Sequence, residues 1–140
     1  NASTGALSYG GTLKNGVGGI TGLDAADGLT LRGSDGKYAY VTSASDHLVW
    51  LERNASTGAL TFGGSLRDGV DGVDGLDAPR MVKLSGSYAY VTSVRDNSIS
   101  WFPMDFGTGA LTLRCSRKAC PQGRVMLSCK RTSQMPNVGS

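Results

Sequence analysis

An internal repeat constrains the fold of this chain more than any other feature. The sequence NASTGAL at residues 1–7 returns letter for letter at residues 54–60, and its TGAL core returns at 108–111. Two further markers recur in the same order, YAYVTS at 38–43 and 88–93, and GLDA at 22–25 and 75–78. Ordered markers with a period of roughly 50 residues predict a fold built from one repeated unit.

Hydrophobic alternation within each repeat predicts short strands separated by Gly- and Asp-rich turns, and no helix. Four antiparallel strands in a repeat of ~40–50 residues are typical of a β-propeller blade. We therefore expect an all-β chain, a β-propeller fragment with antiparallel four-stranded blades at about 27–66 and 79–113 and a leading outer strand at 6–13. The other expected strands lie at residues 29–31, 38–43, 48–53, 59–66, 80–84, 88–93 and 99–102.

The repeats resemble the lactonase-like seven-bladed propellers and the YVTN-type propeller repeats of bacterial and archaeal surface proteins. The resemblance covers about residues 1–113 and rests on the run from Gly33 to Ser43, the RNASTGAL segment at 53–60 and the Asp-Gly series at 68–77. It implies a propeller, an extracellular or cell-surface location, and other blades, a protein or a carbohydrate as partners. Two departures from the pattern are the missing Pro before Asp35-Gly36 and the replacement of that turn by residues 85–87.

Most acidic residues are expected on one face of the fold. Alternate loops of an antiparallel blade share a face, and this rule places eight of the ten Asp residues together, leaving Asp35 and Asp105 on the other side. Ligands of propellers approach on the same face, which is an analogy from fold. The expected ligand-binding residues there are Asp24, Asp46, His47, Asp77, Asp96 and Asn97.

A second hypothesis concerns a metal ion. Asp68, Asp71, Asp74 and Asp77 recur every third residue in a Gly-rich loop, and Ca²⁺ is bound by several oxygen ligands from flexible loops. The spacing matches no calcium-loop signature, and the first repeat lacks three of these four acids. In the alternative interpretation, the Asp side chains accept hydrogen bonds from their own loop backbone. Ca²⁺ is thus a candidate, and no cofactor is assigned.

The residues give little support for catalysis. His47 is the only His and follows Asp46, but the second repeat has Asn97 at the position of His47, which favours a simple turn residue there. No Ser elbow or Cys–His pair is present. Two function classes stay open: a binding or scaffold module of a surface-type propeller, and a fragment of a lactonase-like hydrolase acting on sugar lactones. We expect no lactone hydrolysis by this chain alone, because two blades supply only part of an axial site.

Residues 114–140 differ from the repeats. They carry six Lys/Arg and no acid, whereas residues 1–113 carry a net charge of −3, and they hold all three Cys. Three interpretations stay open for this irregular tail: a nucleic-acid arm, a disordered segment, or a reading frame lost after Leu113. No nucleic-acid partner is assigned, and no apolar run is long enough to span a membrane.

Two blades alone predict incomplete burial. Repeat arrays need at least ~3 units for a continuous core, and open strand edges recruit other chains. We therefore expect self-association or assembly with other blades. The apolar residues expected on two bare outer faces come from a set that includes Leu29, Leu31, Val41, Val82, Leu84 and Val91.

Overall fold

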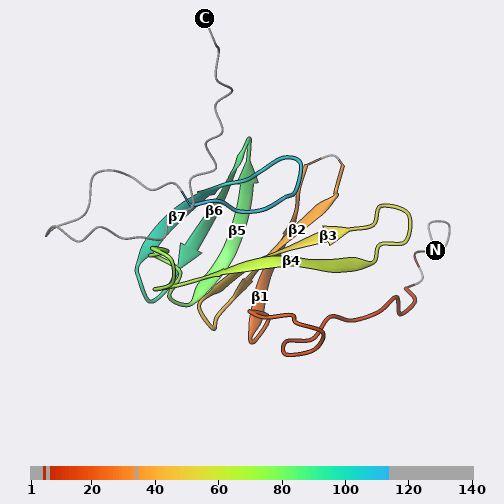
Figure 1. Cartoon of the computed structure of the whole chain (residues 1–140), viewed down its shortest axis with the longest axis horizontal. Coiled ribbons are helices and arrows are strands. Elements are labelled where there is room, and N and C mark those ends of the chain that lie inside the picture. Colours follow the sequence, from red (N-terminus) through yellow and green to blue (C-terminus); the bar gives the residue numbers. More distant parts are fainter. Residues whose placement is uncertain (1–4, 6, 34, 114–140) are drawn as a thin grey trace, which may run out of the picture.

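Two antiparallel sheets and no helix make up the part of the chain that the computed structural model describes, residues 5, 7–33 and 35–113. The first sheet has the order β1 (Ala26–Leu31), β2 (Tyr38–Ser43), β3 (His47–Arg53), β4 (Leu60–Arg67) (Figure 1). The second has the order β5 (Pro79–Ser85), β6 (Tyr88–Ser93), β7 (Ser98–Pro103). The predicted all-β class is confirmed. Within these residues, no helix is long and apolar enough to cross a membrane.

Two of the expected strands are not formed. Residues 7–13, within the expected leading strand, are irregular, and the fourth strand of the second sheet is reduced to one bridge between Met104 and Leu111. A strand needs a neighbour for its backbone N–H and C=O groups, and no described strand lies beside residues 7–13. The second sheet therefore has three strands where four were predicted. The expectations for residues 114–140 fall outside the described residues.

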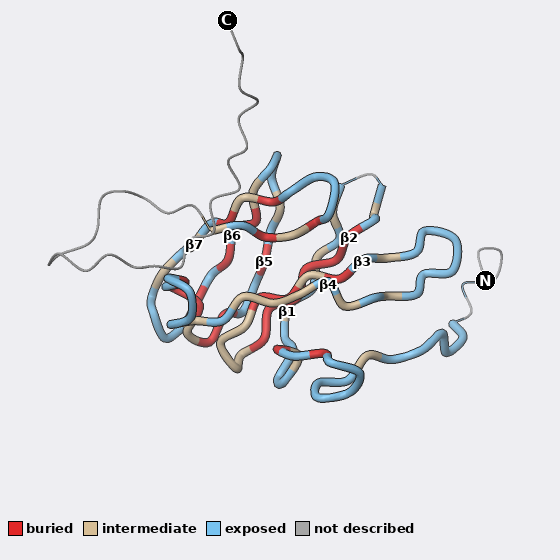
Figure 2. The backbone as a smooth tube through the Cα atoms, viewed as in Figure 1, coloured by how far each residue is buried: buried red, intermediate tan, exposed pale blue. Residues whose placement is uncertain are grey.

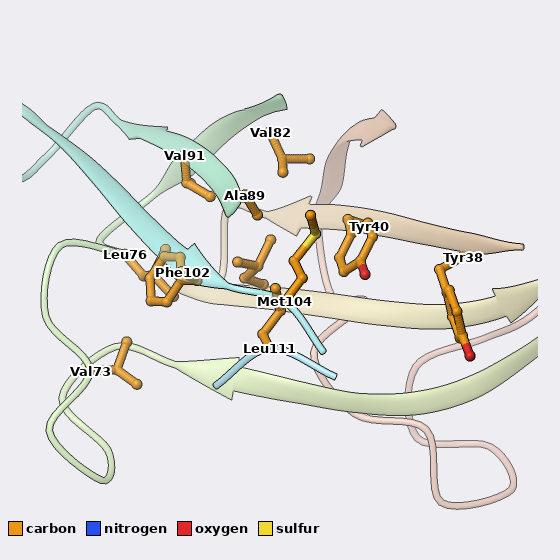
Figure 3. Packing of buried hydrophobic residues seen from close by; sticks show 11 residues of the cluster. Tyr38, Tyr40, Val73, Leu76, Val82, Ala89, Val91, Phe102, Met104 and Leu111 are labelled. Atoms are coloured by element: carbon orange, nitrogen blue, oxygen red, sulfur yellow. The ribbon is translucent and has the colours of Figure 1, made fainter. Parts of the chain in front are cut away.

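The two sheets pack face to face, like neighbouring blades of a ring that is not closed, and the main core lies between them (Figure 2). Because side chains alternate along a strand, every second residue of β2 and β6 points into this core. Figure 3 shows the cluster between the ribbons. Its buried members are Tyr38, Tyr40, Leu48, Val73, Leu76, Val82, Ala89, Val91, Phe102, Met104 and Leu111.

The outer face of the first sheet is covered over β2 and β3, where the prediction of a bare face is wrong, and is open over β1. Val41 is only 5 % exposed, because Leu13 and Leu23 of the leading segment pack on it and its neighbours. From the same predicted set, Val82 and Val91 are buried between the sheets. Alternation alone could not reveal that residues 13–23 fold over the first sheet.

The outer face of the second sheet is open within the described residues. Met81, Tyr90, Ile99 and Trp101 lie on it, and Trp101 keeps 65 % of its surface exposed. The prediction of bare apolar faces is thus confirmed for the second sheet and, in part, for the first. Leu29 and Leu31 of β1 lie opposite Val41 and Ala39, so they share the outer face of the first sheet, and they are 60 % and 47 % exposed.

The third copy of the repeat marker joins the two sheets. The turn at residues 105–110 lies against β2, where the Tyr38 hydroxyl donates to Gly107 O at 2.6 Å and the Tyr40 hydroxyl to Gly109 O at 2.8 Å. Burial raises the pKa of Tyr40 to about 12, so its hydroxyl remains a donor at neutral pH. The stability linked to this raised pKa is present below the usual Tyr pKa and is lost as pH rises through about 12.

We expect Gly109→Ala to lower the free energy of unfolding more than Gly58→Ala. Both glycines close the same marker turn with positive φ, 67° and 74°, where an L-residue costs ~1–2 kcal/mol. Only at Gly109 would the added Cβ lie 2.3 Å from the Tyr38 ring, whereas Gly58 has open space. Urea unfolding of both variants measures the difference. Equal losses would mean that the turn does not dock on β2.

Acid should weaken the same turn. Hydrogen bonds from Thr108 and Gly107 to the carboxylate hold the pKa of Asp105 below its usual value, so its stabilisation is present above the unfolded-state pKa and lost as pH falls through the folded-state pKa. Asn54 accepts the same backbone bonds in the earlier copy. We therefore expect Asp105→Asn to fold at neutral pH but to lose this acid dependence in melts recorded at decreasing pH. Asp105→Ala should be less stable at every pH.

Candidate ligand-binding loop face

The loops that carry most of the acids do come together, and hydrogen bonds join them. Asp46, in the turn between β2 and β3, accepts the Ala78 N–H at Oδ1 and the Asp68 N–H at its carbonyl, both at 3.0 Å. The Asp77 N–H donates to Asp96 Oδ2 at 2.8 Å. Asp46, Asp77 and Asp96 of the expected site are therefore linked through adjacent loops, at the end of the sheets where β2 turns into β3.

Three carboxylates on this face, those of Asp46, Asp68 and Asp96, accept loop backbone N–H groups. Asp68 Oδ1 accepts the Leu76 N–H at 2.9 Å, and one repeat earlier Asn15 Oδ1 accepts the Leu23 N–H at 3.1 Å. An amide oxygen therefore does the same work as a carboxylate at this position. The position requires an acceptor and not a negative charge, which supports the backbone interpretation of the Asp series.

The remaining acids of the two hypotheses do not form a ligand cluster. The Asp24 side chain is exposed, and the residue contributes its carbonyl, which accepts the Ser43 hydroxyl and, at 2.6 Å, that of Ser45. Asp71 and Asp74 are exposed on the loop. In the described part of the chain, no group of three or more His, Cys, Asp or Glu is arranged to hold a metal ion.

His47 is held by backbone. Its Nδ1 lies 2.6 Å from the Ser45 carbonyl, which can only accept, so Nδ1 carries the proton in this bond. The ring lies against Gly22, where an added Cβ would be 2.8 Å from the ring. The neighbouring Asp46 carboxylate binds Ala78 instead of His47. This arrangement positions the imidazole but gives it no carboxylate partner.

The strand register changes how the two repeats correspond at this turn. Ser43 pairs with His47 in the first sheet and Ser93 with Ser98 in the second. Asn97 therefore matches Asp46, and both have positive φ, 50° and 69°. The sequence comparison that set Asn97 against His47 was wrong by one residue, because the second turn is one residue longer. Asn97 is a turn residue, since Asn and Asp tolerate this conformation.

Two cations that sequence reasoning missed lie among the acids. Arg80 pairs with Asp27 at 2.8 Å, and Arg95 lies 3.5 Å from Asp77. These pairs are partly exposed and contribute little to stability, but they reduce the negative charge of the face. No local signal could reveal the first pair, because its members are 53 residues apart.

One groove of the described residues lies away from most of these acids. A groove of about 460 Å³ runs beside β7, between the loop that contains Val73 and Asp74 and the segment Thr112–Leu113. Ile99, Ser100 and Trp101 form part of its wall. Asp74 is the one candidate acid that lines it. The groove therefore follows a strand edge.

Comparison with known proteins supports the fold. No protein-family model and no curated protein sequence matches the chain. The crystal structure of a "putative 6-phosphogluconolactonase" from Bacteroides fragilis matches 62 % of the chain at 27 % identity, with a TM-score of 0.52. The chain spans 23 % of the length of that protein. Over the matched part, the chain has a lactonase-like all-β fold.

We expect calcium to leave the melting temperature unchanged. A ligand that binds only the native state stabilises it by mass action, but the Asp68 and Asp46 carboxylates are already engaged by backbone N–H groups. Calorimetry with millimolar Ca²⁺ and with chelator decides the matter. A rise with Ca²⁺ that Asp74→Asn removes would restore the metal hypothesis.

Asp46→Ala should destabilise the fold by ~1–3 kcal/mol, because it leaves the part-buried Ala78 N–H without its acceptor. Asp71→Ala, at an exposed position of the same loop face, is the matched control. Urea titration at neutral pH measures both. If the two variants lose equal stability, the Asp46 carboxylate does not hold the loops together.

Proposed function

We propose that this chain is a β-propeller repeat module that acts as a binding or scaffold unit of a surface-type protein. The observation that carries the proposal is the open outer face of the second sheet. It presents Tyr90, Ile99 and Trp101 to solvent, while the corresponding face of the first sheet is buried by the next sheet. A large exposed apolar face indicates an interaction site. A further blade or a carbohydrate that stacks on the aromatic rings would suit it.

The residues near the loops also favour a packing role over catalysis. Asp46, Asp68 and Asp96 accept loop N–H groups, and His47 is bound to a backbone carbonyl. Side chains occupied in this way maintain loop structure. The extracellular or cell-surface location rests on the resemblance of the repeats to surface propellers.

The alternative function is that of a fragment of a lactonase-like hydrolase acting on sugar lactones. The similarity to the Bacteroides fragilis protein favours it. An active site would then need residues from further blades, because the described loops show no nucleophile–base pair.

Lactone hydrolysis tests the two functions. We expect no hydrolysis of glucono-δ-lactone or 6-phosphogluconolactone above the buffer rate in a pH-stat, whether the chain is dilute or concentrated. Asn97→Ala, in the equivalent turn of the second sheet, serves as a control for a change in a loop. Turnover that His47→Ala abolishes and Asn97→Ala leaves intact would overturn the scaffold proposal in favour of the hydrolase.

A further inference from the structure

The second sheet repeats a surface that the chain buries on its first sheet. Tyr38, Tyr40 and Leu48 are at most 2 % exposed there, and Trp50 is partly buried beside them. The strand registers pair Tyr40 with Trp50 and, in the second sheet, Tyr90 with Trp101. Similar aromatic and apolar side chains are therefore present on the second sheet, where no other described sheet packs on them. The residues at the matching positions are Tyr88, Tyr90, Ile99 and Trp101.

The edge of the second sheet is incomplete in a defined way. In the first sheet, β4 fills the outer edge of β3, and Gly63 and Gly64 lie on the Trp50 ring at a bulge in the pairing. A Cβ would lie 2.6 Å from that ring at Gly63 and 2.4 Å from it at Gly64, so only glycine fits at both positions. The corresponding edge of β7 borders the groove of about 460 Å³ and has no partner strand among the described residues.

The leading segment has the sequence that this edge lacks. Residues 7–13 read LSYGGTL and residues 60–66 of β4 read LTFGGSL, with the Gly-Gly pair in the same place. Gly11 has φ 148° and Gly64 has φ 154°, so Gly11 already has the φ of the equivalent glycine in the bulge. Leu7 is 100 % exposed, and no atom lies within 4 Å of a Cβ built at Gly10.

We propose that a second copy of this chain docks head to tail on the second sheet, with its residues 10–13 along the open edge of β7. The register of β3 with β4 places Gly11 opposite Trp101, Thr12 opposite Ser100 and Leu13 opposite Ile99. Strand addition of this kind gains backbone hydrogen bonds at an exposed edge. Residues 111–113 lie beside β7 in the same way as residues 60–62 lie beside β3. Residues 7–9 of the incoming copy therefore stay outside the new pairing.

The docked copy keeps its own structure. Its segment 13–25 packs on β2 and β3 at the outer face of its first sheet through Leu13 and Leu23, and the equivalent loop at 67–78 places Leu76 in the core against the second sheet. Within one chain, β5–β7 and the loop at 67–78 pack on β1–β4. The first sheet of the incoming copy, with its loop at 14–25 in place, therefore offers a similar surface to β5–β7 of the other copy. No segment has to unfold for the interface to form.

Two further kinds of contact within one chain have counterparts in the proposed interface between copies. Thr21 Oγ1 lies 3.3 Å from Ser65 Oγ on β4, and the equivalent residues are Asp74 on one copy and Thr12 on the other. A Thr hydroxyl can donate to the carboxylate. Tyr88 and Tyr90 correspond to Tyr38 and Tyr40, whose hydroxyls donate to the 105–110 turn. Their acceptors would be carbonyls of the marker turn at 54–59 of the incoming copy.

Sedimentation velocity of the full chain at about 1–200 µM tests the docking. We expect the average mass to rise with concentration above 14.5 kDa, because a head-to-tail interface adds copies in series. Gly10→Val should shift association to at least about tenfold higher concentration, since its side chain would meet Trp101. Ser8→Val, outside the pairing, should associate like the parent chain. Circular dichroism of the dilute variants checks that both are folded.

Two results would overturn the proposal. One is a parent chain that stays monomeric over the whole range, and the other is Gly10→Val that associates as strongly as the parent. Association of both variants to the same extent would show that the contact lies elsewhere.

Cysteine pairing tests the register. In a background with Cys115, Cys120 and Cys129 changed to Ser, we would mix a Thr12→Cys chain with a Ser100→Cys chain under mild oxidation. We expect a disulfide-linked dimer with Ser100→Cys and at least about fivefold less with Ile99→Cys, whose side chain points to the opposite face. Equal yields, or no linked dimer, would reject the proposed pairing.

This docking deepens the proposed scaffold function and rests on it, but the two can fail separately. Lactone turnover that depends on His47 would reject the scaffold function whatever the sedimentation shows. A monomeric chain without turnover would reject only the docking of a second copy.

Discussion

The packing of β2 against the second sheet is the interaction on which the rest of the structure depends. Tyr38 and Tyr40 fill the space between the sheets, and their hydroxyls would be buried at a cost without acceptors. The 105–110 turn supplies two carbonyls for them, and Arg32 lies over the Tyr38 ring while its guanidinium donates to Phe106 O at 2.9 Å. A single tyrosine pair thus sets the spacing of the sheets, the position of the turn and the path of the chain after β7.

The acidic loops are best understood through the same need to satisfy backbone groups. Loops with so much Gly expose many N–H groups, and the Asp side chains and Asn15 accept them. The first repeat has Asn15 where the second has Asp68. This exchange shows that the hydrogen-bond acceptor is retained at this position while the negative charge is not. A face rich in Asp therefore need not be a cation site, and backbone acceptance accounts for Asp46, Asp68 and Asp96.

The sequence predicted seven of the strands well because alternation and turn residues are local signals. β2 and β6 begin and end at the predicted residues, since Tyr-Ala-Tyr-Val-Thr-Ser alternates cleanly and is bounded by turns. The leading strand at 6–13 was predicted from the same pattern as β4, but pairing is a property of the neighbour and not of the segment. The predicted meeting of the acidic loops at one end of the sheets is seen for Asp46, Asp77 and Asp96. Their partners, such as Ala78 for Asp46, could not be predicted because they depend on how distant loops meet.

The similarity of residues 7–13 to β4 also affects how this chain folds. While the first sheet is forming, the edge of β3 can accept either segment, because both carry the Gly-Gly pair that Trp50 requires. Incorrect pairing would bury a leading segment where β4 belongs and would leave Leu60 to Arg67 outside. Nearly identical repeats thus create a kinetic competitor within the same molecule. The short connection from β3 to β4 through the marker turn favours the correct partner, since closing a short loop costs less entropy.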